Sequence, residues 1–205
     1  DKCAGGERLN DAGNGCESCP DGTFSNPGST SCTDCDHASG YVSKAGTSGA
    51  VKCEYCGPGF YADQISHSCR ECEIDTYSVG GLDACVVCPA GTDNTKGASS
   101  CQPCPPGTFN DRATCVKCAK GQYAEFGASS CSPCSGPGQY SDIEGSAFCK
   151  TAPAGHRPKD DRTGITKCPS GTFTVGGSDT CESCGKGETS REGAAGCSTL
   201  PPALL

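Results

Sequence analysis

Cysteines recur along this chain at a fixed interval, and that interval limits the folds open to it. In most of the sequence a cysteine is followed by another 13 positions later, and two linker residues then lead to the next repeat. The period is therefore 16 residues, and it runs from Cys3 to Cys197. Three repeats differ in length, namely Cys35 to Cys53, Cys104 to Cys115 and Cys134 to Cys149. A repeat this short cannot bury a hydrophobic face alone, so the pattern predicts tandem units that stack on one another.

One repeat lacks both of its cysteines, and its position indicates how the others pair. The cysteines expected at positions 152 and 165 are replaced by Ala152 and Ile165. If the C-x-x-C motifs were themselves disulfides, a single loss would remove both members of one motif, not one member from each of two. The sequence therefore predicts eleven bridges across the longer interval, with no cysteine left over. The predicted pairs are Cys3 with Cys16, Cys19 with Cys32, Cys35 with Cys53, Cys56 with Cys69, Cys72 with Cys85, Cys88 with Cys101, Cys104 with Cys115, Cys118 with Cys131, Cys134 with Cys149, Cys168 with Cys181, and Cys184 with Cys197.

The composition shows why cross-links are needed. Of 205 residues 22 are Cys, and Leu, Ile, Val and Phe together also number only 22, too few for a conventional core. Disulfides this dense are typical of secreted or cell-surface proteins, so we expect an extracellular location. The absence of Met favours a mature chain from a secreted precursor. No run of about 20 apolar residues predicts a membrane span, and the net charge of -8 argues against nucleic-acid binding.

Within a repeat, glycines and an aromatic residue recur at fixed offsets. A P-x-G turn near the start and a second glycine further on predict a short irregular β-hairpin closed by its bridge. An aromatic recurs at or beside one offset, which predicts a minimal core of rings stacked between layers; an exposed aromatic ladder for binding is the alternative. We thus expect a small disulfide-rich fold, an elongated rod of about twelve hairpin repeats with little helix. The repeats occupy 1–199, the repeat at 152–165 lacks its disulfide, and 200–205 begins an incomplete repeat.

Catalytic and metal chemistry find little support in the sequence. Zinc sites take two C-x-x-C motifs each, but the nine motifs here cannot be paired off, and no βαβ pattern supports a redox motif. The histidines, His37, His67 and His156, lie in different repeats and are expected to be several layers apart. Asp160 and Asp161 indicate a solvated loop, with a weak calcium contact as the alternative. We expect no enzyme activity, no metal and no cofactor.

Three repeats carry a motif that resembles a known family. The stretches "CPDGTFS" (19–25), "CPPGTFN" (104–110) and "CPSGTFT" (168–174), each followed by a C-x-x-C, resemble the ephrin-receptor-like cysteine-rich repeat, a relative of tumour-necrosis-factor-receptor modules. The resemblance extends from Cys3 to Cys197. Such repeats occur in receptor ectodomains, in matrix proteins, and in surface or mastigoneme-type glycoproteins of algae and protists. The resemblance implies a non-enzymatic disulfide ladder.

Two functions are compatible with these sequence features. The first is a structural subunit of an extracellular filament, surface hair or coat, which associates with itself or with other surface proteins. The second is a receptor or adhesin stalk that binds a protein ligand. For assembly we expect Leu200, Leu204 and Leu205 to contact the first repeat of the next molecule near Leu9.

Glycosylation is expected to be O-linked. None of the five asparagines begins an N-x-Ser/Thr acceptor. The candidate O-glycan sites are turn hydroxyls, namely Thr23, Thr108 and Thr172.

Overall fold

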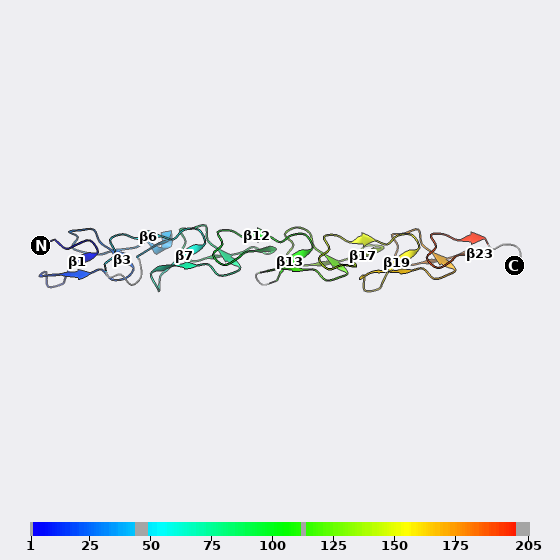
Figure 1. Ribbon diagram of the computed structural model, residues 1–205, viewed down its shortest axis with the longest axis horizontal. Helices are drawn as coiled ribbons and strands as arrows, with labels where there is room; N and C mark the ends of the chain where they lie inside the picture. Colours follow the sequence, from blue (N-terminus) through cyan, green and yellow to red (C-terminus); the bar gives the residue numbers. More distant parts are fainter. Residues whose placement is uncertain (1, 44–48, 112–113, 200–205) are drawn as a thin grey trace. The chain divides into compact units, whose positions relative to one another are not determined.

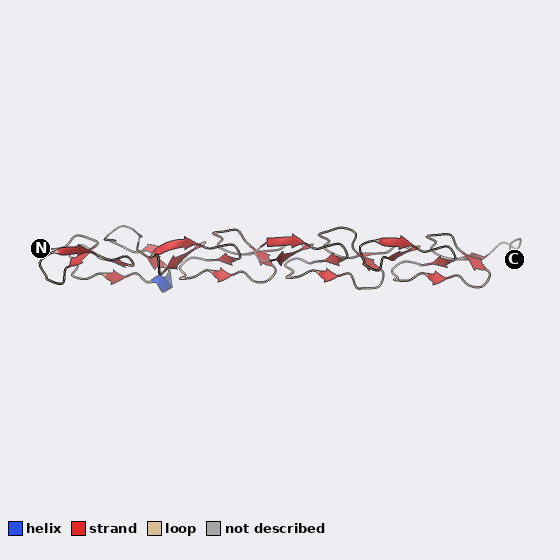
Figure 2. Cartoon of the chain, turned by 90° about the horizontal axis from the view of Figure 1, so that it is seen from below, coloured by secondary structure: helices blue, strands red, loops and turns tan. Residues whose placement is uncertain are grey.

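The computed structural model describes residues 2–43, 49–111 and 114–199. By its contacts the chain forms two compact parts, Asp1–Pro89 with Asp93–Gln102, and Ala90–Thr92 with Pro103–Leu205. Within each part, antiparallel hairpins follow one another in the order of the sequence (Figure 1). The described residues contain twelve such hairpins and a single short 3-10 helix, which Figure 2 shows among the strands. The predicted fold class, tandem disulfide-rich β-hairpin repeats with little helix, is confirmed.

We number the repeats from one to twelve in chain order. In the N-terminal part the hairpins are β1 (Glu7–Leu9) with β2 (Cys16–Ser18), β3 (Thr23–Phe24) with β4 (Thr33–Asp34), β5 (Tyr41–Val42) with β6 (Glu54–Tyr55), β7 (Phe60–Asp63) with β8 (Ser68–Glu71), and β9 (Thr76–Tyr77) with β10 (Val86–Val87). The 3-10 helix η1 (His37–Ser39) precedes β5. The boundary between the parts runs through β11 (Thr92–Asp93) and β12 (Gln102–Pro103). The C-terminal hairpins are β13 (Thr108–Asp111) with β14 (Thr114–Lys117), β15 (Gln122–Tyr123) with β16 (Ser132–Pro133), β17 (Gln139–Tyr140) with β18 (Lys150–Thr151), β19 (His156–Pro158) with β20 (Ile165–Lys167), β21 (Thr172–Phe173) with β22 (Glu182–Ser183), and β23 (Glu188–Thr189) with β24 (Ser198–Thr199).

All but one of the hairpins begin directly after a turn glycine with positive φ; in repeat five Asp75, with a φ of 68°, stands at this position. In repeat two, Gly22 has a φ of 85°, and the Thr23 amide donates to the Pro20 carbonyl over 3.2 Å. Glycine suits this position because it adopts positive φ without a steric penalty. The returning strand is the two-residue linker between cysteines, which the sequence suggested only as a connector. β3 pairs with the linker strand β4, and the linker strand is exposed.

Backbone hydrogen bonds join each repeat to the next. In repeats four and five the Cys72 amide donates to the Gly59 carbonyl over 2.9 Å, and the Gly59 amide donates to the Ser78 carbonyl over 2.7 Å. The second glycine of a repeat adds another bond, as where the Gly81 amide donates to the Cys56 carbonyl over 3.0 Å. The same scheme recurs in the C-terminal part. No disulfide links two repeats, so these bonds hold the repeats together.

The turn glycine of one repeat also packs against the return turn two repeats further on. A methyl group built on Gly59 would lie 2.2 Å from the Gly97 carbonyl oxygen, and one built on Gly155 would lie 2.0 Å from the Gly193 carbonyl oxygen. Real Cβ atoms do not approach backbone atoms so closely, because overpacking forces the neighbours apart. Glycine is therefore required here for space as well as for its backbone conformation.

Bridged cysteines and small side chains form most of the buried interior. The first cysteine of most repeats is buried, as are small residues that follow the aromatic position, such as Ser25, Ser78 and Ser141. Eight repeats have an aromatic residue at or beside the predicted offset. Tyr140 is buried and Tyr41 is exposed, and the other six are half-buried, namely Phe24, Tyr61, Tyr77, Phe109, Tyr123 and Phe173. The aromatic core is thus less complete than the sequence suggested, because the close approach of the backbones leaves room only for small side chains between them.

Candidate functional site

The bridges occupy the predicted positions. The eleven disulfides join the 22 cysteines in the tandem pairs given above, with Cα–Cα distances between 5.4 Å for Cys56 with Cys69 and 5.8 Å for Cys35 with Cys53. Repeat ten, residues 152–165, is the repeat without a bridge. Since no disulfide stabilises this repeat, other contacts have to take that role, and we therefore consider it as the candidate site.

Ala152 and Ile165 occupy the positions that cysteines hold elsewhere. Ala152 is 1% exposed, as buried as the cysteines that begin neighbouring repeats, and its amide donates to the Gly138 carbonyl over 2.8 Å. Ile165 pairs with Pro158 in the β19–β20 hairpin, in the register that pairs Cys16 with Leu9 in repeat one. The alignment drawn from the sequence therefore holds in space, and the bridge is absent without a shift in register.

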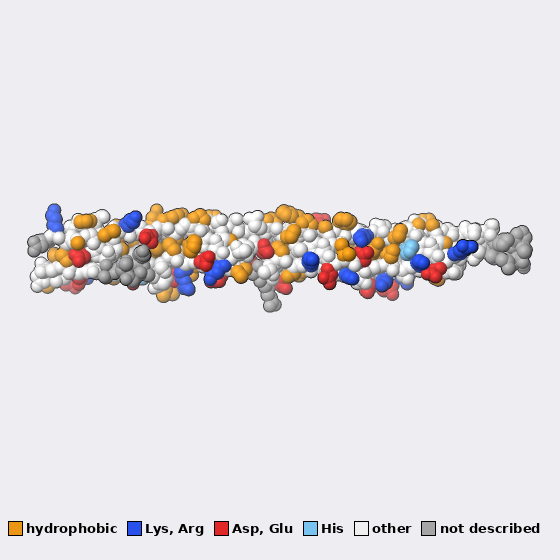
Figure 3. Space-filling model, in the orientation of Figure 1, with side chains coloured by type: hydrophobic (Ala, Val, Ile, Leu, Met, Phe, Trp, Pro, Cys, Tyr) orange, Lys and Arg blue, Asp and Glu red, His pale blue; other side chains and the backbone are white. Residues whose placement is uncertain are grey.

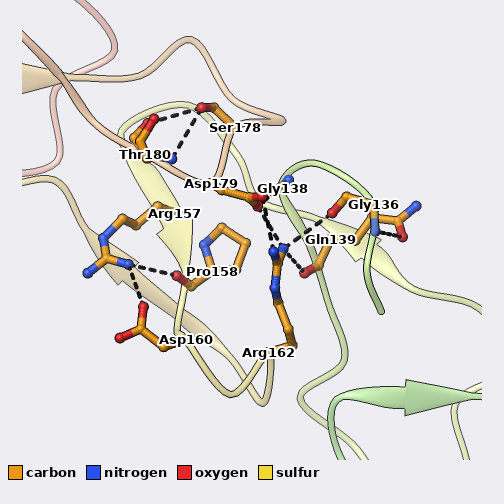
Figure 4. Close-up of polar contacts among 10 residues, drawn as sticks. All are labelled: Gly136, Gly138, Gln139, Arg157, Pro158, Asp160, Arg162, Ser178, Asp179 and Thr180. Atoms are coloured by element: carbon orange, nitrogen blue, oxygen red, sulfur yellow. Dashed lines mark hydrogen bonds and ion pairs between the residues drawn. The ribbon is translucent and has the colours of Figure 1, made fainter. Parts of the chain in front are cut away.

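Arg162 fastens the turn of this repeat to its neighbours. Figure 4 shows the guanidinium between the Asp179 carboxylate of repeat eleven and two main-chain carbonyls of repeat nine. Its Nη1 and Nη2 donate to the two carboxylate oxygens over 2.7 and 3.0 Å, and Nη1 also donates to the Gly136 and Gln139 carbonyls over 3.2 and 3.1 Å. Asp179 Oδ1 further accepts from the Gly138 amide over 2.8 Å. One side chain thus ties three consecutive repeats together, and we call these contacts the Arg162 clamp.

The backbone conformation of Arg162 is rare for a residue with a side chain, which indicates that its contacts hold it in place. Its φ is 60°, in the left-handed region that non-glycine residues rarely adopt. The matching position in repeat one is Gly13, with a φ of 69°, and both turns close with the same pair of main-chain bonds. Arginine therefore stands where glycine is the easier residue. Strain of this kind persists only where surrounding contacts fix it, and the four guanidinium bonds supply those contacts.

The contacts in the clamp stabilise the ionised form of the Asp179 carboxyl group. The hydrogen bond from Arg162, and then the one from the Gly138 amide, lower the pKa of Asp179 below its usual value of 3.8. A hollow of about 210 Å³ lies beside the clamp and is lined by Arg157, Pro158, Lys159, Asp160, Arg162 and Asp179. Both acids in it are already engaged with arginines, since Arg157 donates to Asp160 over 3.1 Å.

The acidic pair has local partners. Asp160 accepts from Arg157, whereas Asp161 accepts from the amide and hydroxyl of Thr163 over 3.0 and 2.8 Å, which lowers the pKa of Asp161. These contacts fit the solvated-turn interpretation better than a calcium contact. In the described residues, no group of three or more His, Cys, Asp or Glu side chains is placed to hold a metal ion.

The expected separation of the histidines is wrong for two of them. His37 Nε2 and His67 Nδ1 lie 3.3 Å apart, although the residues belong to repeats three and four. Adjacent repeats are hydrogen-bonded turn against turn, so loops 30 residues apart in the sequence can meet. His156 lies in the C-terminal part, where its Nδ1 is 3.2 Å from the Ala154 carbonyl oxygen.

The three candidate glycan sites have a structural role of their own. Thr23, Thr108 and Thr172 are half-buried, and each hydroxyl donates to the carbonyl of the proline three residues earlier over 2.7 Å. A glycan at these positions would have to replace that bond. O-glycosylation stays a prediction, and the assembly residues Leu200, Leu204 and Leu205 lie outside the described residues.

Comparison with known proteins gives no family for the chain. No protein-family model matches the sequence, and no curated protein matches it.

No helix within residues 2–43, 49–111 and 114–199 is long and apolar enough to cross a membrane. On the face shown in Figure 3, acidic, basic and hydrophobic side chains are interspersed.

Proposed function

We propose that the chain is a non-catalytic extracellular structural protein, a subunit of a filament, surface hair or coat. The observation that carries the proposal is the reuse of one set of backbone contacts from repeat to repeat. Cysteine amides, turn-glycine amides and return-turn glycines make the same bonds in both parts of the chain. Most of the recurrent sequence features therefore maintain the stack itself, which is what a structural element requires.

The disulfides and the motif resemblance support this proposal. Eleven bridges indicate a secreted or extracellular setting, where disulfides form and persist. The resemblance to ephrin-receptor-like repeats, which occur in algal and protist surface proteins of the mastigoneme type, favours an architectural role. We propose that the chain belongs to that class of repeat proteins.

For self-association we propose that the leucines at 200, 204 and 205 of one molecule contact the first repeat of the next. A hollow of about 350 Å³ lies there, lined by Leu9, Gly13, Asn14, Gly15 and Cys16. A head-to-tail contact of this kind does not close on itself and yields an open filament. The hollow offers an apolar side chain, Leu9, beside four small or polar residues, which suits leucine side chains from a second copy.

Electron microscopy of the oxidised, secreted protein tests the proposal. We expect filaments from the full chain, and dispersed molecules with unchanged disulfides when 200–205 are deleted or Leu9 is changed to Ser. The variant Ile65→Ser, at an exposed position away from this hollow, is the matched control and should still assemble. Assembly of the deletion variant at the normal rate would exclude the leucine contact. Monomers at all concentrations for the full chain would exclude self-assembly altogether.

A receptor or adhesin stalk is the second candidate, and exposed apolar side chains favour it. In the C-terminal part Phe126 and Phe148 are 67% and 69% exposed, and Val175 is 79% exposed. Exposed aromatic residues of this size are common at protein-binding surfaces. The two candidates separate in the same experiment. If the chain is a stalk, it stays monomeric and binds a protein ligand through these side chains. If it is a filament subunit, Phe126→Ser and Phe148→Ser should leave filament formation unchanged.

A further inference from the structure

Two of the three histidines meet in the N-terminal part, and nothing in the proposed structural role requires them. His37 is the first residue of η1, and His67 lies directly before β8 in the turn of repeat four. Their ring centroids are 5.3 Å apart with planes tilted by 53°, and His67 Nδ1 lies 3.3 Å from His37 Nε2. Both side chains are half-buried, so the pair lies at the surface within reach of solvent ions.

The backbone around the pair fixes both rings. Asp36 caps η1 by accepting from the Ser39 amide over 3.2 Å, and Gly40 ends the helix in the left-handed region. His67 has a φ of 48°, which is rare for a residue with a side chain. A methyl group built on Gly22 would lie 2.6 Å from His67 Nδ1, so glycine at that position leaves the space that the ring occupies. The two caps fix the backbone that carries His37, and Gly22 leaves space for the ring of His67, whose own backbone conformation is unfavourable.

We propose that His37 and His67 form a binding site for a borderline divalent transition-metal ion of the Zn²⁺ or Cu²⁺ class. Two imidazole nitrogens bound to one tetrahedral Zn²⁺ at the usual distance of about 2.0–2.1 Å are roughly 3.3 Å apart, the separation observed here. Imidazole is a preferred ligand for Zn²⁺ and Cu²⁺, whereas ions that favour thiolates find none, since every cysteine is bridged.

The pair supplies two protein ligands, so other groups would have to complete the coordination of the ion. The Asp36 carboxylate is the nearest acid in sequence, and it is occupied as the cap of η1. Water would take the remaining positions, as it does at metal sites with fewer than four protein ligands. In the metal-free pair one ring nitrogen donates its proton to the other. When the ion binds, that ring moves its proton to its other nitrogen through solvent, so both facing nitrogens present lone pairs and no net proton is released.

Titration of the full, oxidised chain with Zn²⁺ or Cu²⁺ alone tests this site. Calorimetry should show one ion bound per chain, and Cu²⁺ should broaden the imidazole NMR signals of His37 and His67 while leaving those of His156 sharp. The variant His67→Asn removes one ligand but keeps a residue that tolerates positive φ. It and His37→Gln should each weaken binding by about tenfold or more. His156→Gln is the matched control and should bind as the unmodified chain does.

The possible results distinguish a loss of the metal site from a loss of the fold and from a loss of assembly. No binding by the unmodified chain, or equal binding by His37→Gln and His67→Asn, would overturn the proposal. Loss of binding in His156→Gln alone would assign the ion to another place and overturn it too. Peptide mapping without reduction should give the same disulfides for all four proteins. Filament formation is measured in a separate experiment, because the metal site does not depend on the proposed structural role.

Discussion

Repeats one and ten have the same hairpin, and only one of them has a disulfide. The three residue pairs of β1 with β2 match those of β19 with β20, so that Leu9 lies opposite Cys16 in repeat one and Pro158 lies opposite Ile165 in repeat ten. Their turns close with matching bonds, since the Asn10 amide donates to the Gly15 carbonyl over 2.8 Å and the Lys159 amide donates to the Gly164 carbonyl over 2.9 Å. The bridge is therefore not what sets the hairpin register. Strand pairing and turn residues set it, and the bridge limits the unfolded chain.

What replaces the bridge in repeat ten lies between repeats and not within one. The Arg162 clamp reaches into repeats nine and eleven, whereas the bridge from Cys3 to Cys16 closes repeat one on itself. A disulfide stabilises a repeat whether or not its neighbours are in place. A clamp does so only when they are, so repeat ten should depend more on its neighbours than repeat one does.

The largest effect should come from the feature that both repeats share, the turn glycine. In repeat ten, Gly155→Ala places a methyl group about 2.0 Å from the Gly193 carbonyl oxygen at a φ of 76°. We expect a loss of about 3 kcal/mol or more in the free energy of unfolding, from backbone strain and overpacking together. Gly171→Ala is the matched control, because its φ is 81° but no described atom lies within 4 Å of the added methyl. It should cost only about 1 kcal/mol. Equal losses for both, by chemical denaturation, would show that the contact between repeats does not matter.

Turning repeat one into a repeat without a bridge should have the next largest effect. The double variant Cys3→Ala, Cys16→Ile copies the pair found in repeat ten but supplies no arginine in the turn, where Gly13 stands. We expect a loss of about 3 kcal/mol, the value for a loop of this length in the chain-entropy model. Hydrogen exchange across residues 7–18 should quicken, while exchange across 156–167 stays unchanged. If the variant repeat one remains as protected as before, hairpin contacts alone suffice and the clamp is not a substitute for the bridge.

The reverse change should give a smaller gain. The double variant Ala152→Cys, Ile165→Cys restores the missing pair at the positions that match Cys3 and Cys16, since Ile165 lies opposite Pro158 as Cys16 lies opposite Leu9. A twelfth bridge should form and stabilise the chain by at most about 3 kcal/mol, and by less if the clamp already restrains this repeat. Peptide mapping without reduction detects the bridge. Two free thiols that persist under oxidising conditions would contradict the alignment of this repeat with the others.

The sequence predicted what is decided within one repeat and missed what is decided between repeats. The bridges, the turn glycines and the hairpins follow from spacing that can be read along the chain. The contact of Gly155 with Gly193 and the meeting of His37 with His67 depend on how consecutive repeats are placed on each other, and no motif encodes that. Arg162 had a readable signal, because arginine stands where repeat one has a glycine with positive φ. Its partner Asp179 had none, since it lies in another repeat.

The smallest expected effect is the pH dependence of the Arg162 clamp, which repeat one cannot form because Gly13 stands at the matching position. The pKa of Asp179 is lowered, first by Arg162 and then by the Gly138 amide, so the clamp is at full strength above the unfolded value of 3.8. Its contribution is lost as the pH falls through the folded pKa, which lies lower still. The Gly138 amide donates to Asp179 Oδ1, so its NMR shift should follow this titration. The Gly155 amide, which donates to the Thr174 carbonyl and to no carboxylate, is the internal control and should not show this transition.

Asp179→Asn and Arg162→Gln separate the causes of that transition. Asparagine keeps an oxygen that can accept from Gly138 but cannot titrate, so the transition at the Gly138 amide should disappear. Arg162→Gln leaves the carboxylate but removes its main partner, so the midpoint should move up toward 3.8. A midpoint that stays where it was would mean that the guanidinium does not hold the carboxylate in solution. Repeat ten would then keep its register through strand pairing alone, and its difference from repeat one would reduce to the absent bridge.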